Sequence, residues 1–558
     1  MRALINDLLR NVISCWITFA GFLMSGWQRL RTRSFFKDQA RLKRQYGITD
    51  DTPVLSYGPE LEQLIQAATI KAGRNAKFAF TSGSSGKPKR ILYTKRRLRA
   101  LNFAYSESFA RACRAFRIRR TSLYVFSSLQ PDDSLTSLLL DEKQLPSYFA
   151  TLQAPYRVQR DPAILALTAK YGSAAVRLWI LTIANPGVFY ATNPSTISTF
   201  FDDLSNHWRQ SSKLIKDWCD DPKQFEPNVR KIARRLDSVG SKRRLQVIAA
   251  SDVPVSVEVW APPLEAYICW TGGYVKPFLD RVQKYLPPER YQLIPMYSMS
   301  TETLETVSYF QDRDALFIPL ARGVIYEFIE EPGGEHLIGP AEVQPGKTYA
   351  MIVSDGYGLR RYHTGDLFKS RERLLRFHAG ETPAVPGKST TFCRGKINGL
   401  PDLMFLRRRG LAYSFTGEKL TGEQVSAVFE QLRAQYPELL ADKYLTCVPS
   451  QPAHEIPHYK LLLIGDRKTR SIISHDHLAA RFDELLKEVN CEYKTKRTSG
   501  RLGPVRFIEM SVRDFAGRLS RNGTWESQFK FLPLCQHTWE SGEMFCSHFN
   551  SNAVRRVS

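Results

Sequence analysis

The sequence lacks the cysteine pattern of a disulfide-bonded or zinc-binding protein. Its 558 residues include nine cysteines, an odd number, and no two of them form a C-x-x-C pair. Secreted domains rely on paired cysteines, and structural zinc sites use closely spaced ones. The scattered cysteines argue against both classes, so we expect a reducing compartment, the cytoplasm.

The sequence also lacks the commonest phosphate-binding loop, G-x-x-x-x-G-K-[ST]. The nearest approach is Gly387-Lys388-Ser389, but Thr382 stands where the first glycine should be. Pro383 and Pro386 fall inside the would-be loop, and no apolar strand leads into it. These departures argue against a P-loop ATPase.

Internal repeats and low-complexity tracts are absent as well. The chain is longer than one hydrophobic core normally spans, and its 43% hydrophobic and 24% charged residues are typical of a soluble globular protein. Strand-like apolar runs alternate with helical stretches, which predicts an α/β fold with a large domain and a smaller one. The strands are expected at 264–270, 291–296, 316–329 and 348–353, and helices at 96–117 and 278–286.

Acidic residues are few compared with basic ones, 55 against 79, which gives a net charge of +24. Such a surface can hold nucleic acid or anionic lipid, or it can suit anionic substrates such as ATP and carboxylates. The basic residues are spread along the chain and are not gathered into a tail. We therefore do not expect nucleic-acid binding as the main function.

Residues 11–27 form the one long apolar run, with arginines on both sides. A membrane-spanning helix needs about 20 mostly apolar residues, whereas this run is shorter and includes polar side chains. No convincing small-residue cleavage site follows it, which argues against a signal peptide. Two interpretations stay open: a helix packed on the large domain, or a membrane-surface helix whose basic flanks face anionic lipid.

The most informative motif is residues 80–89, which read FTSGSSGKPK. Glycines allow the backbone to turn tightly and to approach a ligand closely. Hydroxyls and backbone N–H groups donate to phosphate oxygens, and lysines neutralise their charge. The run therefore predicts a loop that binds a triphosphate.

Three further motifs suit the rest of a nucleotide. Residues 270–273, WTGG, end an expected strand where a flat base can lie against bare backbone. Residues 297–302 read YSMSTE, and a carboxylate after two hydroxyls suits Mg²⁺ shared with phosphates. Residues 361–366 read RYHTGD, and Asp366 can accept hydrogen bonds from both hydroxyls of a ribose.

Two motifs lie nearer the C-terminus. Residues 405–411 read FLRRRGL and are followed by Ser414 and by GEKL at 417–420, which suits a hinge between domains. Residues 523–530 read GTWESQFK. Taken singly, each of these motifs is also compatible with an ordinary turn or a solvated basic surface. Their order and spacing favour a nucleotide-dependent enzyme.

The set of motifs resembles the acyl-adenylate-forming superfamily. Within it, ICWTGG, the FLRRRG…S…GEKL block and the terminal GxxxxQxK most resemble the auxin-responsive Gretchen Hagen family of acyl acid amido synthetases and its bacterial relatives. The resemblance covers roughly residues 36 to 535. It implies a mixed α/β fold: an apolar helix at 1–35, a large ATP- and acyl-binding domain of sheets flanked by helices at 36–408, and a mobile lid domain at 409–558.

The resemblance implies a ligase with ATP and Mg²⁺ as cofactors. A carboxylic acid would be adenylated and then transferred to an amine or amino acid, and the protein would act as a monomer. The residues that would hold the β- and γ-phosphates are Ser82, Gly83, Ser84, Ser85, Gly86 and Lys87. The remaining nucleotide contacts would come from Gly272 and Gly273 at adenine, Ser300 and Thr301 at AMP, and Asp366 at ribose.

Three residues are implied to be catalytic: Thr301, Glu302 and Lys530. Glu302 would also bind the metal, Lys530 would enter the site during adenylation, and Arg408 would lie at the hinge. Two alternatives remain. The acyl group can pass instead to a thiol, such as coenzyme A or a carrier protein, or the chain can bind nucleotide without turnover.

Overall fold

The computed structural model divides the chain into two compact units. Unit 1 comprises Met1–Phe80, Arg90–Gly272 and Val282–Leu406, and unit 2 comprises Thr81–Lys89, Gly273–Arg281 and Arg407–Ser558. The residues that the structure describes are 2–80, 89–127, 129, 135, 138–139, 158–271, 275–296, 300–311, 314–371, 374–375, 393–394, 396–397, 399–408, 412–413, 415–416, 418, 420–440, 443–452, 455–465, 475–512, 514–515, 532–535 and 538–539.

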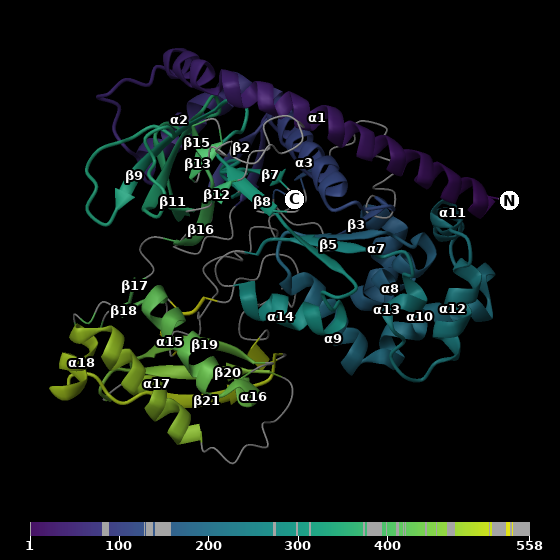
Figure 1. Cartoon of the computed structure of the whole chain (residues 1–558). Coiled ribbons are helices and arrows are strands. Elements are labelled where there is room, and N and C mark those ends of the chain that lie inside the picture. The colour runs from purple at the N-terminus through teal and green to yellow at the C-terminus, as the bar shows by residue number, and fades with distance from the viewer. Residues whose placement is uncertain are drawn as a thin grey trace, which may run out of the picture. The chain divides into compact units, whose positions relative to one another are not determined.

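Unit 1 begins with a long helix, α1 (Arg2–Tyr46), which contains the apolar run and continues well past it. Figure 1 shows α1 as a straight rod that passes α3 (Lys95–Ala115) and reaches α11 (Pro227–Leu236). Its later part is fixed to a strand of unit 1, because the Gln39 amide bonds both the carbonyl of Val324 and the N–H of Tyr326, at 2.8 and 3.0 Å. The apolar segment and the residues after it therefore form one helix.

A parallel sheet of unit 1 has the strand order β3 (Leu123–Phe126), β4 (Val188–Ala191), β5 (Ala266–Cys269) and β6 (Gln292–Pro295). One face packs on α3, with Val125, Ile268 and Ile294 in the same cluster as side chains of α3 and α1. The other face is aromatic, and Phe189 stacks 6.2 Å from the buried ring of Trp260. Both faces are covered, as a parallel sheet requires.

The helices that follow β3 in unit 1 are largely short and amphipathic. Their bounds are α7 (Pro162–Tyr171), α8 (Ser173–Ala184), α9 (Ser195–Asn206), α10 (Trp208–Asp220), α12 (Ser241–Ala250) and α13 (Val257–Trp260), with 3-10 turns at Val158–Arg160 and Pro222–Gln224. Helix α8 is the exception, because almost its whole surface is buried. A helix that is apolar on all sides belongs in a core, and α8 lies at the centre of this group.

An antiparallel sheet forms the rest of unit 1, in the order β16 (Leu403–Arg408), β11 (Tyr362–Ser370), β10 (Thr348–Asp355) and β9 (Val324–Glu331). Two hairpins accompany it, β1 (Lys77–Phe80) with β2 (Arg90–Tyr93) and β7 (Val307–Gln311) with β8 (Asp314–Ile318). Helix α2 (Pro59–Ala72) packs on the same core through Leu61 and Ile65. Short pairs complete the set: β12 (Leu374–Leu375) with β13 (Cys393–Arg394), and β14 (Lys396–Ile397) with β15 (Leu400–Pro401).

Unit 2 has its own sheet and its own core. The strand order is β19 (Tyr444–Ser450), β20 (His458–Ile464) and β21 (Arg506–Met510), antiparallel and then parallel. The helices are α15 (Gly422–Gln435), α16 (Pro437–Leu440), α17 (His475–Val489) and α18 (Cys491–Thr498), and β17 (Ala412–Tyr413) pairs with β18 (Leu420–Thr421). Helix α14 (Lys276–Tyr285) belongs to both units, because the chain is divided between Arg281 of unit 2 and Val282 of unit 1.

The mixed α/β prediction is therefore confirmed: the chain contains several sheets flanked by helices. Most of the expected strands and helices are present, with ends that differ by two residues or fewer. One prediction needs correction, because the run expected as a single strand at 316–329 is divided between β8 and β9. A turn at Gly323, where φ is +74°, separates the two strands.

Candidate functional site

The phosphate-loop motif lies in sequence between strands β1 and β2, which we call the phosphate-loop hairpin. The two strands pair from Lys77 opposite Tyr93 to Phe80 opposite Arg90, so the residues on either side of 81–89 lie opposite each other. Arg90 stacks over the ring of Phe78 at 3.6 Å, and its backbone N–H donates to the Tyr57 hydroxyl at 2.8 Å. The site residues predicted in the loop, from Ser82 to Lys87, lie outside the described residues.

The next two motifs follow neighbouring parallel strands. Cys269, the last residue of β5, pairs with Pro295, the last residue of β6. Trp270 and Thr271 follow β5, and Ser300 to Glu302 come shortly after β6. Ligands of open α/β sheets bind outside the carboxyl ends of the strands, and both motifs begin at this edge. Gly272 and Gly273, which were predicted to border adenine, are not among the described residues.

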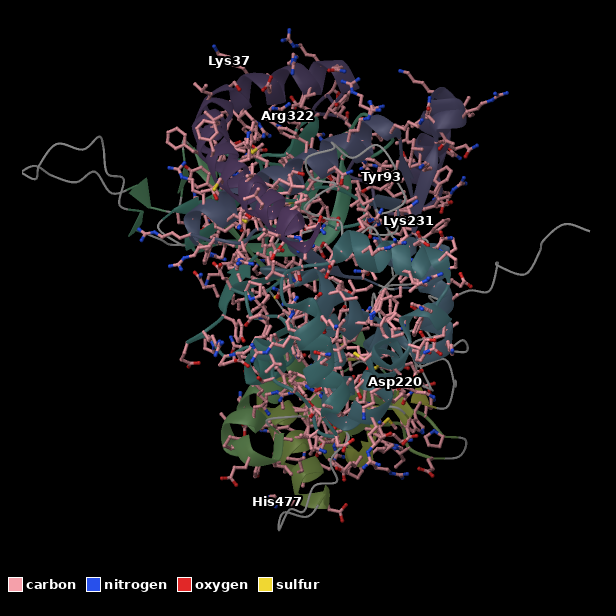
Figure 2. The ribbon with its side chains drawn as sticks, turned by 90° about the vertical axis from the view of Figure 1, so that its right-hand side faces the viewer. Lys37, Tyr93, Asp220, Lys231, Arg322 and His477 are labelled. Carbon is pink, nitrogen blue, oxygen red and sulfur yellow. The ribbon has the colours of Figure 1, made fainter. Side chains whose placement is uncertain are left out.

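A hydrogen bond joins the hairpin to the Ser-Thr-Glu motif. Tyr93, the last residue of β2, donates its hydroxyl to the carbonyl oxygen of Thr301 at 2.8 Å. The Tyr93 side chain, labelled in Figure 2, is buried. Burial raises the pKa of Tyr93 to about 12, although the nearby Arg97 acts in the opposite direction. The hydroxyl therefore stays protonated near neutral pH and remains a donor to Thr301.

Arg97 ties the same motif to the antiparallel sheet. It lies in the first turn of α3, where the Thr94 hydroxyl caps the helix by accepting from the Arg97 N–H. Its Nη2 donates to the carbonyl oxygen of Glu302 at 2.6 Å and to Oδ2 of Asp355 at 2.7 Å. Asp355, at the end of β10, also accepts from two backbone N–H groups of the following turn. One buried ion pair thus fixes the backbone on which the Glu302 carboxylate stands.

The Thr-Gly-Asp motif forms a bulge in β11. Ala350 of β10 lies opposite Leu367, yet Ile352 lies opposite His363, so residues 364–366 face a single residue of β10. Gly365 has a φ of +83°, which glycine adopts without strain. Bulges re-aim side chains and are frequent beside active sites. The bulge thereby determines the position of Asp366, which is buried.

Tyr362 connects this strand to the predicted metal ligand. Its hydroxyl donates to Oε1 of Glu302 at 3.1 Å, and both side chains are buried. Together with Tyr93 and Arg97, this bond brings the elements that carry the phosphate-loop, Ser-Thr-Glu and Thr-Gly-Asp motifs into one connected network within unit 1. The Ser-Thr-Glu and Thr-Gly-Asp motifs, far apart in sequence, therefore meet at Glu302, and strand β2, which follows the phosphate-loop motif, is joined to them through Tyr93.

The remaining predicted site residues belong to other parts of the chain. Arg408 is the last residue of β16, and the division between the units lies just before it, between Leu406 and Arg407. Lys530 is not among the described residues. Two residues later the chain is fixed along β19, where the Thr446 hydroxyl donates to the Leu532 carbonyl at 2.7 Å. The hinge role of Arg408 and the catalytic role of Lys530 stay predictions.

Sequence reasoning missed four residues of this network: Tyr93, Arg97, Asp355 and Tyr362. Tyr362 was quoted in its motif without a role, and the other three lie outside the motifs. The partners of Arg97 lie 205 and 258 positions away in sequence. No local sequence pattern reveals such pairing. The one available signal is weak: Tyr93 and Arg97 lie shortly after the phosphate-loop motif, and Tyr362 lies within the Thr-Gly-Asp motif.

The residues available for a metal fit Mg²⁺. Glu302 contributes a carboxylate, with the hydroxyl residues Ser300 and Thr301 beside it in sequence. Within the described part of the chain, no group of three or more histidine, cysteine, aspartate or glutamate side chains could hold a metal. Mg²⁺ bound with a nucleotide commonly uses one or two carboxylates together with phosphates and water, so a single buried carboxylate is an adequate protein ligand.

We predict that Tyr362→Phe will weaken the effect of Mg²⁺ without unfolding the protein. The variant keeps the ring in the core and removes only the hydroxyl that orients Glu302. Loss of a group that orients a metal ligand typically costs about 10- to 100-fold in metal affinity or activity. Titration of activity with Mg²⁺ measures this cost. Tyr349→Phe, another buried tyrosine of unit 1, is the matched control, and an unchanged Mg²⁺ dependence in Tyr362→Phe would contradict the assignment.

The two-unit α/β organisation and the joined motifs are those expected of the adenylate-forming class. Three domain models of one family match the chain in order: the GH3 family N-terminal domain at residues 58–290, the central domain at 317–376 and the C-terminal domain at 423–538. The chain therefore belongs to the GH3 family, and the resemblance to the Gretchen Hagen family is confirmed.

Two curated rice proteins are similar over part of the chain. Jasmonoyl–L-amino acid synthetase GH3.5 of Oryza sativa subsp. japonica is 28% identical over 169 residues, which are 29% of this chain and 21% of that protein. Indole-3-acetic acid-amido synthetase GH3.8 of Oryza sativa subsp. indica is 23% identical over 195 residues, which are 34% of this chain and 26% of that protein. The matched regions thus span about a quarter of those relatives or less.

Solved structures extend the likeness to most of the fold. The acyl acid amido synthetase GH3.15 in complex with 2,4-DB superposes with a TM-score of 0.62 at 15% identity, covering 89% of this chain and 87% of that one. A second structure of the GH3.15 acyl acid amido synthetase gives 0.61 at 14% identity, with coverage of 89% and 88%. At this identity the likeness establishes the fold alone.

Proposed function

We propose that this protein is an ATP-dependent, AMP-forming ligase that joins a carboxylic acid to an amine or an amino acid. The observation that carries the proposal is the buried network at Glu302, which connects the phosphate-loop hairpin, the Ser-Thr-Glu motif and the Thr-Gly-Asp strand. Family membership supports it, because both rice relatives are named as synthetases that conjugate an acid.

The proposed reaction has two steps. An oxygen of the carboxylate attacks the α-phosphorus of ATP, and pyrophosphate leaves. The amine then attacks the acyl carbon of the acyl-adenylate, and AMP leaves with the original carboxylate oxygen, while the amine loses a proton. Charge builds up at the α-phosphate in the first step, so catalysis relies on positioned cations and donors.

Each matching residue has a role in this proposal. The loop residues Ser82 to Lys87 hold the β- and γ-phosphates, and Ser300 and Thr301 contact AMP. Asp366 accepts from the ribose hydroxyls, and Gly272 and Gly273 border adenine. Mg²⁺ would be held by Glu302 and would neutralise phosphate charge. The network of Tyr93, Arg97 and Tyr362 fixes the Thr301 and Glu302 groups before the nucleotide binds.

The proposal includes movement of unit 2 as a lid. Lys530, two residues before the segment fixed along β19, would approach the α-phosphate for adenylation and withdraw for transfer. Arg408, beside the division between the units, would lie at the hinge. Motion of a lid between two half-reactions allows a single site to serve both.

The experiment for this proposal is an acceptor screen. Pyrophosphate release is measured with ATP, Mg²⁺ and a panel of carboxylic acids, with and without amino acids, amines and coenzyme A. We expect acid-dependent release, and an acylated product only with amino acids or amines. A thioester product alone would contradict the amide-forming function. No release with any acid, combined with ATP binding by calorimetry, would indicate a protein that binds nucleotide without adenylating.

We predict that Asp366→Ala will weaken ATP binding about 10- to 100-fold, since a hydrogen bond to a charged group contributes about 1.5–3 kcal/mol. Calorimetry with ATP and 2′-deoxy-ATP measures the effect. The wild type should prefer ATP, and the variant should bind the two nucleotides almost equally. Asp220→Ala, on the exposed end of α10, is the control. Unchanged nucleotide affinity in Asp366→Ala would show that the ribose assignment is wrong.

A further inference from the structure

The first half of α1 has an inverted pattern of polarity. Eleven of its side chains between residues 3 and 24 are exposed, and none of them carries a charge. Asn11 and Cys15 are two of these. The other nine are large and apolar, with 48–66% of each side chain exposed, and we call them the apolar face: Leu4, Ile5, Leu8, Leu9, Val12, Trp16, Phe19, Phe22 and Leu23. A helix on the surface of a soluble protein normally presents charged residues outward.

The two charged residues of this segment, Asp7 and Arg10, and the neighbouring Asn6 face the protein instead. Asn6 donates to the carbonyl of Asp237 at 2.9 Å, and Asp7 accepts from the N–H of Val239 at 3.1 Å. Arg10 is paired with Asp7 at 2.8 Å and also donates to the carbonyl of Leu236 at 2.6 Å. These contacts fix the helix against the end of α11 and orient it, so that its apolar side remains outward.

The contacts continue along the helix. The Ser14 hydroxyl accepts from both the N–H and the hydroxyl of Thr121, at 3.1 and 3.0 Å. Ile17 is buried with residues of α3 and the parallel sheet. At Gly21 the backbone lies so close to the Ala110 carbonyl that a Cβ would meet its oxygen at 2.4 Å. The helix is thus held on unit 1 at four successive turns.

The same segment is the one helix in the described part of the chain that is long and apolar enough to cross a membrane, by length and composition, over Ala3–Met24. Crossing would require the release of Asn6, Asp7 and Arg10 from their partners and their transfer into hydrocarbon. Ionic side chains are costly there. The contacts therefore favour a helix that lies in the plane of an interface, with only its outer side in the apolar layer.

Basic side chains border the apolar face. Arg114 of α3 lies over the ring of Phe22, with its guanidinium carbon 4.6 Å from the ring centroid. The chain that leaves α3 toward Thr121, the partner of Ser14, carries three more exposed arginines, Arg117, Arg119 and Arg120. On α11, beside the start of α1, the exposed basic residues are Lys231, Arg234 and Arg235, and Figure 2 labels Lys231.

We propose that the apolar face is a docking surface for a negatively charged phospholipid bilayer, with α1 lying flat in the interface. Apolar side chains that include tryptophan and phenylalanine enter the boundary of the acyl chains, and the bordering arginines meet lipid phosphates. A second copy of the chain that docked through the same face is a poorer occupant, because it would bring the same arginines against those of the first copy. The chain's net charge of +24 favours the anionic surface further.

The test is flotation of the full chain with vesicles. Phosphatidylcholine vesicles are compared with vesicles that also contain phosphatidylglycerol, at low and high salt. We expect binding to the anionic vesicles, weaker binding to phosphatidylcholine alone, and loss of the anionic preference as salt screens the arginines. The double variant Trp16→Asp/Phe19→Asp should bind at least about tenfold more weakly, because each charge opposes insertion of the face.

The matched control is Ile70→Asp/Val253→Asp, since these apolar side chains are 73% and 67% exposed elsewhere on unit 1. This control should bind vesicles like the wild type, and the thermal midpoints of both variants should stay close to that of the wild type. Arg114→Glu/Arg120→Glu should lose the preference for anionic vesicles.

Three results would overturn the proposal. The first is a wild-type chain that does not float with anionic vesicles. The second is a wild-type dimer, seen by sedimentation, that Trp16→Asp/Phe19→Asp converts to a monomer, because the face would then bind a second copy. The third is a protein that alkaline carbonate does not extract from the vesicles and whose Trp16 fluorescence is quenched by lipids brominated near the bilayer centre. Together these two results would mean that the helix spans the membrane.

Discussion

Arg97→Met is expected to lower the free energy of unfolding of unit 1 by about 3–5 kcal/mol, the usual cost of removing one partner of a buried ion pair. The Arg97 and Asp355 side chains are only 10% and 3% exposed, so the remaining carboxylate would be buried without its cation. The loss is measured by urea unfolding, followed by the near-ultraviolet signal of the buried Trp179 and Trp260. Adenylation should fall too, because the carbonyl of Glu302 loses its donor.

Two further variants distinguish loss of this ion pair from a general destabilisation of helix α3. Arg96→Met replaces an exposed arginine on the same helix and should change stability by less than about 0.5 kcal/mol. The double variant Arg97→Met/Asp355→Asn should be more stable than Arg97→Met alone, since asparagine keeps an acceptor for the turn and carries no charge. If Arg97→Met and Arg96→Met unfolded at the same urea concentration, the buried pair would not hold the site together.

Lys530→Ala is expected to slow formation of the acyl-adenylate by about 100- to 1000-fold, the typical effect of removing one group that stabilises transition-state charge. Formation of the amide from a preformed acyl-adenylate should change little, because the lysine withdraws before that step. Rapid quench of each half-reaction gives the two rates separately.

Lys494→Ala, on the exposed surface of α18 in the same unit, should leave both rates unchanged. Lys530→Arg keeps the charge and should recover part of the first rate. If Lys530→Ala slowed both half-reactions equally, the proposal that Lys530 acts from a lid during adenylation alone would be wrong.

Several elements could be predicted from the sequence because their signals are local. The apolar run at 264–270 ends at Thr271-Gly272-Gly273, and β5 forms there with all its residues buried. The run at 291–296 likewise becomes β6. Where two apolar strands are separated by only a few residues, apolar content alone does not reveal the turn between them. For this reason the turn at Gly323, between β8 and β9, was not predicted. Helix α1 shows a second limit, because its apolar residues indicated burial or lipid contact but not which side faces the protein.

The candidate site was predictable only in part, for a related reason. Thr301, Glu302 and Asp366 were predicted because each stands in a short motif that resembles a family pattern, and their roles stay predictions. The groups that hold them are distant in sequence: Tyr93 reaches Thr301 across 208 positions, and Tyr362 reaches Glu302 across 60. Such contacts arise from the pairing of strands and the packing of α3, and no local pattern in a single sequence predicts them.

The most direct test of the central claim follows an oxygen atom. A carboxylic acid that supports pyrophosphate release is labelled with ¹⁸O in its carboxyl group, and the reaction is run with ATP, Mg²⁺ and the amine acceptor. If an acyl-adenylate forms, one ¹⁸O atom per turnover will appear in the phosphate of AMP, as measured by mass spectrometry. Unlabelled AMP, or label in inorganic phosphate together with ADP, would show that the carboxylate does not attack the α-phosphate and would contradict the account.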